Sequence, residues 1–221
     1  MEYKFQFGVV RDNWQFLLEG IWITISVTGG ALVVGLFVGL FLGMMRLSKF
    51  KTISQPALCY IELFRNTPAL VQLMWVYYAL PILTGLELNA VMSCTLALAL
   101  NMSAYMAEIF RGGIQSIEKG QVEAARSLGL SFAQTMRKVV LPQAVRRMIP
   151  PFVNETVSLV KYSSLVSILG VADLTYQANV LSTTTFRPLE VFSFIALVYL
   201  VICTSLSYSA QRIEKRLSVS D

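Results

Sequence analysis

The stretch that decides the fold is GIWITISVTGGALVVGLFVGLFLGMM, residues 20–45, which contains no Asp, Glu, Lys or Arg. A helix rises about 1.5 Å per residue, so roughly 20 apolar residues cross the ~30 Å hydrocarbon core of a bilayer. Three further stretches of at least that length also lack charged residues: 66–86, 88–107 and 191–211. A fifth apolar region, about 149–171, is interrupted only by Glu155 and Lys161. The pattern predicts five membrane spans.

The composition agrees with a membrane protein. Of the 221 residues, 55% are hydrophobic and 14% are charged, whereas about a quarter of the residues of a soluble domain are charged. Hydrocarbon offers no partner to backbone amides, so each span must pair its own as a helix. The polar segments between the apolar runs are short. We therefore expect an all-α, polytopic chain in which residues 1–221 form a single membrane domain.

The basic residues predict the orientation, because Lys and Arg near span ends collect on the cytoplasmic side. They follow the first, third and fifth spans: Arg46, Lys49 and Lys51; Arg111, Lys119, Arg126, Arg137, Lys138, Arg146 and Arg147; Arg212, Lys215 and Arg216. The loop after the second span has none, and the loop after the fourth has only Arg187. The N-terminus is thus predicted outside and the C-terminus inside. The net charge of +5 then reflects topology and needs no nucleic-acid partner.

Several chemical signatures are absent from the sequence. There is no GxxxxGK[ST] phosphate-binding loop, so the chain has no such site for ATP. There is no histidine, and the three cysteines lack metal-ligand spacing, so no metal site is expected. We predict no catalytic residues and no cofactor in this chain. If it transports a solute actively, the energy comes from a partner or from an ion gradient.

Small residues recur at four-residue intervals in the first span, at Ala31, Gly35, Gly39 and Gly43. They lie along one helix face and allow another backbone to approach closely. The sequence leaves open whether that neighbour belongs to the same chain or to a second subunit.

Polar residues also mark the second span. Glu62 and Arg65 are three positions apart and could pair on one helix face, and Gln72 follows seven positions later on the same face. Pro68 could kink this helix because it lacks an amide donor. Ionisable groups at membrane depth usually face a cavity or a partner. Arg65 is therefore either part of a transport path or a structural residue near the cytoplasmic interface.

The third span carries a polar stripe of Asn101, Tyr105 and Glu108, at spacings of four and three. Such a stripe either lines a water-filled path or hydrogen-bonds to neighbouring helices.

The fourth span places Glu155, Ser158 and Tyr162 on one face, and Lys161 points elsewhere. A carboxylate with hydroxyls nearby could hold a polar or zwitterionic solute. The alternative is an interhelical hydrogen-bond network.

The segment between the third and fourth spans, about residues 112–147, is too polar for the membrane and too short for an independent domain. A helical stretch over 121–128 ends at Gly129, which suits a left-handed terminal residue. Ser131 followed by Gln134 predicts a capping box that starts a second helix. That helix is expected to run to about residue 141, where Pro142 interrupts it. The result is a helix–turn–helix on the cytoplasmic face.

This segment also contains a spaced motif, Glu123-Ala124-Ala125, Gly129 and Val139-Val140-Leu141-Pro142. It resembles the EAA motif of the membrane subunits of bacterial ABC importers: EAA, three residues, G, nine residues, I, one residue, LP. Every spacing fits, with Val139 in place of isoleucine. ELFRNTPALVQL at 62–73 and AEIFRGGIQSI at 107–117 are similar to the polar amino-acid branch, the histidine/glutamine/glutamate type.

The resemblance implies a type I-like ABC importer permease in the bacterial inner membrane, with its N-terminus periplasmic and its C-terminus cytoplasmic. Two copies of a cytoplasmic ATPase subunit would bind ATP, a second permease, identical or different, would complete the path, and a periplasmic binding protein would deliver a polar amino acid. Membrane lipid would surround the spans. The residues that couple to the ATPase would be Glu123, Ala124, Ala125, Gly129, Val139, Leu141 and Pro142. The residues expected along the substrate path are Arg65, Gln72, Asn101, Glu108, Glu155, Ser158 and Tyr162.

One position departs from the family pattern. Relatives often read Lys-Asp-Thr-Ser-Leu where this chain has Lys161-Tyr162-Ser163-Ser164-Leu165. If the missing carboxylate binds cationic side chains in relatives, its absence favours a neutral or acidic amino acid here. An alternative function is an ion-coupled secondary transporter or channel that uses Glu108, Glu155 and Lys161.

Overall fold

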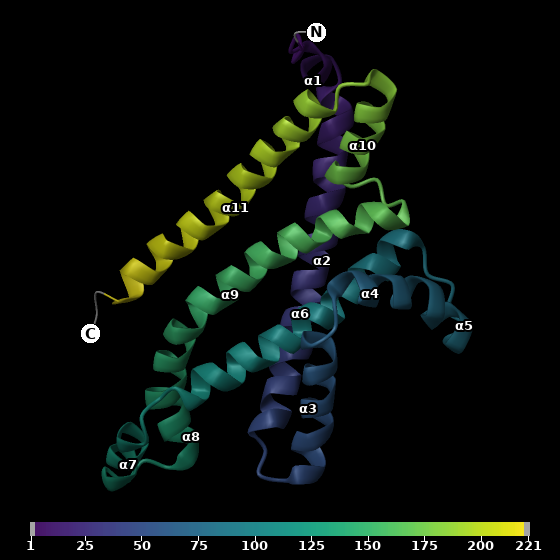
Figure 1. The fold of residues 1–221 in the computed structure, drawn as a ribbon. Helices are drawn as coiled ribbons and strands as arrows, with labels where there is room; N and C mark the ends of the chain where they lie inside the picture. Colours follow the sequence, from purple (N-terminus) through teal and green to yellow (C-terminus); the bar gives the residue numbers. More distant parts are fainter. Residues whose placement is uncertain (1–2, 219–221) are drawn as a thin grey trace.

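The computed structural model describes residues 3–218, and the regular elements in that part of the chain are all helices (Figure 1). The elements are α1 Gly8–Asp12, α2 Trp14–Leu47, α3 Lys51–Arg65, α4 Ala69–Met74, the π-helix η1 Trp75–Ala79, α5 Leu80–Thr84, α6 Ala90–Gln115, α7 Lys119–Ser127, α8 Phe132–Thr135, the π-helix η2 Met136–Val140, α9 Leu141–Ser163, the 3₁₀-helix η3 Ser164–Leu169, α10 Leu174–Thr185 and α11 Pro188–Ser218. The all-α prediction is confirmed.

Three helices are long and apolar enough to cross a membrane in one piece: Trp14–Leu47, Ala90–Gln115 and Pro188–Ser209. Two bent helix pairs bring the count to five if each pair is one span. The described residues thus hold three to five candidate spans, and the predicted number of five is reached if each bent pair crosses the membrane once.

The second span is broken between α3 and α4. The segments Lys51–Arg65 and Ala69–Thr84 meet at an angle of 106°. Pro68 is extended, with ψ 135, and precedes the first residue of α4; a proline also disfavours helical geometry in the residue before it. Because of this break, Arg65 and Gln72 do not lie on one continuous helix face. The expectation that they share a face was wrong.

The fourth span is also bent. Phe132–Leu169 and Leu174–Thr185 meet at 51°. Gly170, with φ +77, ends η3 in the left-handed region that favours glycine. Asp173 then starts α10 by accepting a hydrogen bond from the amide of Tyr176 at 2.9 Å.

Pro81 and Pro142 each lie two residues beyond a π-helical segment, η1 and η2 respectively. A proline in a helix clashes with the carbonyl four residues earlier, which here belongs to Tyr77 or Lys138. Both carbonyls lie inside π segments, whose hydrogen bonds span one residue more than those of an α-helix. The helix therefore continues through Pro142 into α9, and the prediction that it ends near residue 141 was wrong.

The glycine face of α2 packs against α6 of the same chain. A Cβ at Gly35 would lie 2.8 Å from Cβ of Met102, and one at Gly39 would lie 2.8 Å from the carbonyl oxygen of Ser103. Ala31 and Met102 are also buried in the largest core cluster. Close packing within the chain accounts for this face, which settles the alternative that the sequence left open.

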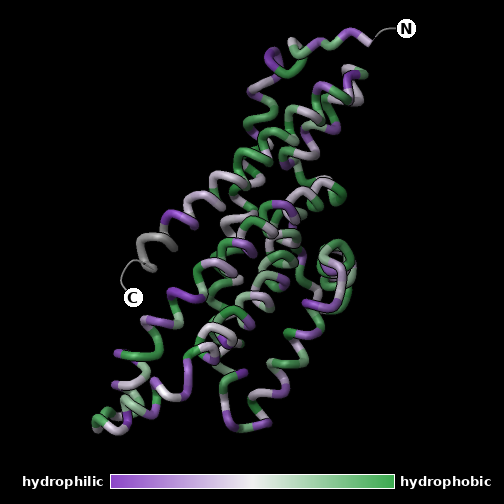
Figure 2. The backbone as a smooth tube through the Cα atoms, turned by 60° about the vertical axis from the view of Figure 1, so that its left-hand side comes forward, coloured by the Kyte–Doolittle hydropathy of each residue, from purple (hydrophilic) through white to green (hydrophobic). Residues whose placement is uncertain are grey.

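The two ends of the molecule differ in character. The α2–α3 turn, α7 and α8 lie at the lower end in Figure 1, whereas the N-terminus and the α10–α11 turn lie at the upper end. Figure 2 shows long hydrophobic stretches along the helices and hydrophilic residues at the lower end. The lower end holds the basic groups that follow the first and third spans. Of the basic residues after the fifth span, the side chains of Lys215 and Arg216 lie outside the described part of the chain.

At the upper end, a clamp joins residues 3–6 to the start of α11. The carboxylate of Glu190, fully buried, accepts hydrogen bonds from the Tyr3 hydroxyl at 2.5 Å and from the Gln6 amide at 2.9 Å. Arg187 donates to the Lys4 carbonyl at 2.9 Å. The bond to Glu190 raises the pKa of Tyr3 above its ordinary value, because the carboxylate stabilises the protonated hydroxyl.

Candidate functional site

A cavity of about 470 Å³ lies between the end of α3, the second half of α6 and α9. Its polar lining comes from seven residues: Arg65, Tyr105, Glu108, Ser116, Arg147, Asn154 and Glu155. Gly112, Gly113 and Pro151 line it as well. The structure thus brings together three of the predicted path residues, Arg65, Glu108 and Glu155, each from a different helix. Tyr105, which belongs to the polar stripe of α6, joins them.

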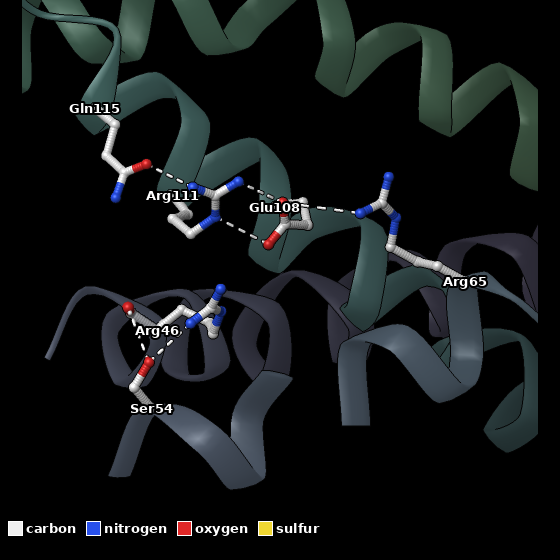
Figure 3. Close-up of polar contacts among 6 residues, drawn as sticks. All are labelled: Arg46, Ser54, Arg65, Glu108, Arg111 and Gln115. Atoms are coloured by element: carbon white, nitrogen blue, oxygen red, sulfur yellow. Dashed lines mark hydrogen bonds and ion pairs between the residues drawn. The ribbon is translucent and has the colours of Figure 1, made fainter. Parts of the chain in front are cut away.

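Glu108 is the centre of the charge network in this cavity (Figure 3). Its two oxygens accept hydrogen bonds from Nε and Nη2 of Arg111 at 2.9 and 2.6 Å. Nη1 of Arg65 lies 3.7 Å from the same carboxylate, and its guanidinium stands 5.5 Å from the centre of the Tyr105 ring. Because these side chains are partly exposed, solvent screens the ion pairs. The network therefore orients the arginines more than it stabilises the fold.

In the described part of the chain, Arg65 is paired with Glu108 on α6 rather than with Glu62. The sequence expectation of an Arg65–Glu62 pair was therefore wrong. Local spacing on α3 permits that pair, but the packing of α3 on α6 offers Arg65 a carboxylate and an aromatic face together.

Glu155 and Arg147 add charges of both signs from α9. Glu155 is half-buried and lines the cavity together with Arg65 of α3. Arg147 donates a hydrogen bond to the backbone carbonyl of Ser116, at the end of α6. A cavity with guanidinium groups and carboxylates on different walls can hold both ends of a zwitterion.

A second cavity, of about 340 Å³, shares Arg65 and Tyr105 with the first. Residues 66–69 at the break of the second span line it, together with Asn101 and Tyr162. Arg65 and Tyr105 therefore lie between the two cavities. Neither Asp nor Glu lines the second cavity.

Gln72 and Ser158 are placed differently from the other predicted path residues. The amide nitrogen of Gln72, which is 7% exposed, donates to the carbonyls of Phe64 and Thr67 at 2.8 and 3.0 Å. The Ser158 hydroxyl donates to the Asn154 carbonyl at 3.0 Å, and this serine lines neither cavity. Asn101 lines the second cavity, but its amide donates to Gln72 at 2.9 Å.

The predicted turn between two helices of residues 112–147 is present, although the first helix begins at Lys119 and the second continues into α9. Gly129 has φ +77, and the amides of Gly129 and Leu130 donate to the carbonyls of Arg126 and Ala125, which closes α7. Ser131 and Gln134 make the predicted capping box at the start of α8. These local expectations are confirmed.

The predicted coupling residues fall on two sides of this segment. Glu123 and Ala124 are exposed, whereas Ala125 is buried. Leu141 and Pro142 are exposed and Val139 is half-buried. Val140 belongs to a small core with Ile117, Ala144 and Met148. This core joins the segment to α6 and α9, the helices that line the first cavity.

Sequence reasoning missed two apolar side chains and one arginine. Leu128 and Phe132, on either side of the Gly129 turn, are 81% and 69% exposed. Apolar residues on both sides of a predicted turn are the sequence signal that motif matching did not use. Arg111 was counted only as a topology marker, yet it holds Glu108 in the cavity.

Comparisons with known proteins match nearly the whole chain. The family "binding-protein-dependent transport system inner membrane component" matches residues 35–219. A probable glutamine ABC transporter permease of Bacillus subtilis is 38% identical, over 96% of this chain and 98% of its own length. The glutamine transport system permease of Escherichia coli K12 is 37% identical, over 98% and 99%. The arginine transport system permease of Bacillus subtilis is 35% identical, over 93% and 94%.

A solved structure agrees with these sequences. The crystal structure of an amino acid ABC transporter with histidines matches with a TM-score of 0.91 and 38% identity, covering 97% of this chain and 100% of that one. The methionine transporter MetNI, in an inward-facing conformation, matches with a TM-score of 0.75 at 20% identity, which shows a shared fold. Our chain therefore belongs to the family of binding-protein-dependent transport system inner membrane components, and it is the inner-membrane permease subunit of an ABC importer whose ATPase is a separate subunit.

Proposed function

We propose that this permease moves a polar amino acid from the periplasm to the cytoplasm, along a path that passes between the two cavities at Arg65. The position of Arg65 carries the proposal, because it is the cationic side chain common to both cavity walls. An arginine guanidinium binds a carboxylate with two parallel hydrogen bonds, and every free amino acid presents a carboxylate.

The other end of the amino acid needs an acceptor. Glu155 and Glu108 both line the larger cavity and are the groups available for an ammonium. Glu108 is already bonded to Arg111 through both oxygens. Glu155 is therefore the better acceptor for the substrate, and Asn101, Tyr105 and Tyr162 line the adjoining second cavity.

The substrate side chain is proposed to be neutral or acidic. Tyr162 stands in the second cavity where relatives often carry an aspartate, and Arg65 is the charged group beside it. A cationic side chain would be desolvated there without a counter-charge, which costs several kcal/mol. A glutamine or glutamate side chain has hydroxyl and amide partners on the same wall.

The energy for transport comes from ATP, which is held by two copies of a cytoplasmic ATPase subunit. The segment 112–147 is the surface that contacts the ATPase. The supporting observation is a rigid turn, closed at both helix ends, with Leu128 and Phe132 exposed beside it. Glu123 and Ala124 form the exposed polar side of this contact. Motion of the segment would pass to α6 and α9 through their shared core.

We further propose that residues 1–221 form a single permease domain and that its other partners follow from this role. A second permease, identical or different, would face the polar cavities, and a periplasmic binding protein would dock at the end that holds the N-terminus. The C-terminus is then cytoplasmic. Membrane lipid covers the apolar faces, and the basic residues report topology rather than nucleic-acid binding.

Uptake by proteoliposomes containing the permease, its ATPase and its binding protein tests the proposal. We expect the unmodified complex to take up glutamine or glutamate faster than arginine. Tyr162→Asp should raise the arginine to glutamine rate ratio by about tenfold, the effect of one charge-assisted hydrogen bond of roughly 1.5 kcal/mol. Tyr162→Asn is the matched control and should leave the ratio low. Equal ratios in both variants would contradict this placement of the substrate side chain.

A further inference from the structure

The break in the second span leaves backbone groups without helical partners at membrane depth. α3 ends at Arg65 and α4 begins at Ala69, so the carbonyls before and within the break need donors. An unsatisfied carbonyl in hydrocarbon costs several kcal/mol, so such breaks persist only where side chains supply the bonds. The donors found here identify what holds the break in shape.

The side chain of Gln72 donates to two of these carbonyls, and the Thr67 hydroxyl donates to a third, that of Leu63. The Gln72 nitrogen lies 2.8 Å from the Phe64 carbonyl, 3.0 Å from the Thr67 carbonyl and 2.6 Å from the Thr67 hydroxyl. These acceptors lie on both sides of Arg65 and Asn66. A single amide from the first turn of α4 thus fixes the direction of the chain through the break.

Asn101 extends the same network to α6. Its nitrogen donates to the Gln72 side-chain oxygen at 2.9 Å and lies 3.4 Å from the Phe64 carbonyl. Asn101 is 4% exposed, so water does not compete for these bonds. One turn further along α6, Tyr105 receives the Arg65 guanidinium on its ring.

We propose that the Gln72–Asn101 amide pair is a positioning device, which holds the broken span in register with α6 so that Arg65 stays between the two cavities. The inference rests on the proposed role of Arg65 in the substrate path. It gives Gln72 a function that needs no contact with the substrate.

The test separates positioning from folding by two readouts in the reconstituted complex. The first is the number of amino acids moved per ATP hydrolysed, and the second is the reactivity of a thiol at Asn66, introduced as Asn66→Cys after the three native cysteines are replaced. Asn66 lines the second cavity beside Arg65. Gln72→Met and Asn101→Leu remove the amides with little loss of volume.

We expect Gln72→Met and Asn101→Leu to lower the ratio of transport to ATP hydrolysis about tenfold, since small misplacements of a binding group have effects of this order or larger. The rate at which a charged thiol reagent labels position 66 should change in both variants. Gln177→Met on α10 is the matched control, because Gln177 is 6% exposed and lies on a different element. It should change neither readout.

The milder variant Thr67→Val covers the case in which Gln72→Met does not fold, because it keeps the Gln72 amide and removes only the Thr67 hydroxyl, which accepts from Gln72 and donates to the Leu63 carbonyl. It should shift the labelling rate in the same direction. Unchanged labelling and unchanged coupling in every folded variant would overturn the proposal. If labelling changes while uptake by both these variants and Arg65→Gln stays normal, the positioning device stands and the assignment of Arg65 to the path falls.

Discussion

Gly129 sets the shape of the turn that carries the exposed Leu128 and Phe132 side chains. Its φ of +77 lies in the left-handed region, where an L-residue costs about 1–2 kcal/mol and a β-branched one more. A Cβ at this position would have no atom within 4 Å. Any effect of a substitution here therefore comes from the backbone and not from a steric clash.

This predicts a clear difference between two substitutions of similar size. Gly129→Val should lower binding-protein-stimulated ATP hydrolysis and uptake by tenfold or more, because the turn can no longer present its side chains to the ATPase. Gly129→Asn should keep most of the activity, because asparagine tolerates the left-handed region. Immunoblots of washed membranes should show equal insertion of both proteins. Normal uptake by the valine variant would count against a role of the turn in coupling.

For single residues, interactions with near neighbours in the chain were predictable from the sequence, and contacts between different helices were not. Gly129 and the Ser131–Gln134 capping box depend on neighbours within four residues, so their motifs were sufficient. The partner of Arg65 depends on how α3 packs on α6, which no spacing within α3 encodes. The same limit hid the bonds of Gln72 with Phe64 and Asn101.

Among the elements, α2 and α6 make the most extensive contact, and glycines on α2 allow it. Without a hydrophobic driving force between helices in lipid, association depends on van der Waals packing at short distance. Gly39 lies where a Cβ would meet the Ser103 carbonyl at 2.8 Å, whereas Gly29 on the same helix has no atom within 4 Å of that position.

Replacing each of these two glycines by alanine is therefore predicted to affect the stability of the folded protein differently. Gly39→Ala should destabilise the folded protein by about 1–3 kcal/mol through overpacking. Gly29→Ala should leave its stability unchanged or raise it by up to about 1 kcal/mol, because alanine is the better helix former. Thermal unfolding of the purified protein in detergent measures both. A Gly39→Ala variant as stable as the parent would show that α2 and α6 can separate without cost.

The positions of the long helices followed from the apolar runs, but their ends and the breaks between segments did not. Residues 66–86 contain no charge, so hydropathy alone could not show that α3 meets the following segment at 106°. Pro142 was interpreted as a helix end because a proline usually is one. The π segment η2 before it removes the clash and keeps the helix intact.

Across the whole molecule, the basic groups of the α2–α3 turn and of residues 112–147 lie at one end, and the N-terminal clamp lies at the other. Membrane proteins keep Lys and Arg on the cytoplasmic side. This separation predicts a single orientation of the molecule in the bilayer.

Thiol labelling of right-side-out vesicles tests that orientation. In a chain without its native cysteines, Glu87→Cys should react with an impermeant reagent added outside, because Glu87 lies in the exposed loop before α6. Lys119→Cys, at the start of α7, should react only after the vesicles are permeabilised. The reverse pattern would place the coupling segment in the periplasm and would refute its contact with an ATPase.

The class of the protein and the positions of its apolar helices could be predicted from the sequence, because long apolar runs and a spaced motif can be recognised without tertiary information. The cavities could not. They arise where α6, α9 and the broken end of α3 converge, and that convergence depends on the breaks and on the glycine contact between α2 and α6.

The clamp between the first residues and the start of α11 constrains how the chain matures on the ribosome. Tyr3 and Glu190 are 187 positions apart, so the earliest segment to be translated is stabilised by one of the last. Until Glu190 has been translated, residues 3–6 cannot make these bonds. A nascent chain truncated before α11 therefore lacks the contacts that hold its N-terminal residues as well as its last helix.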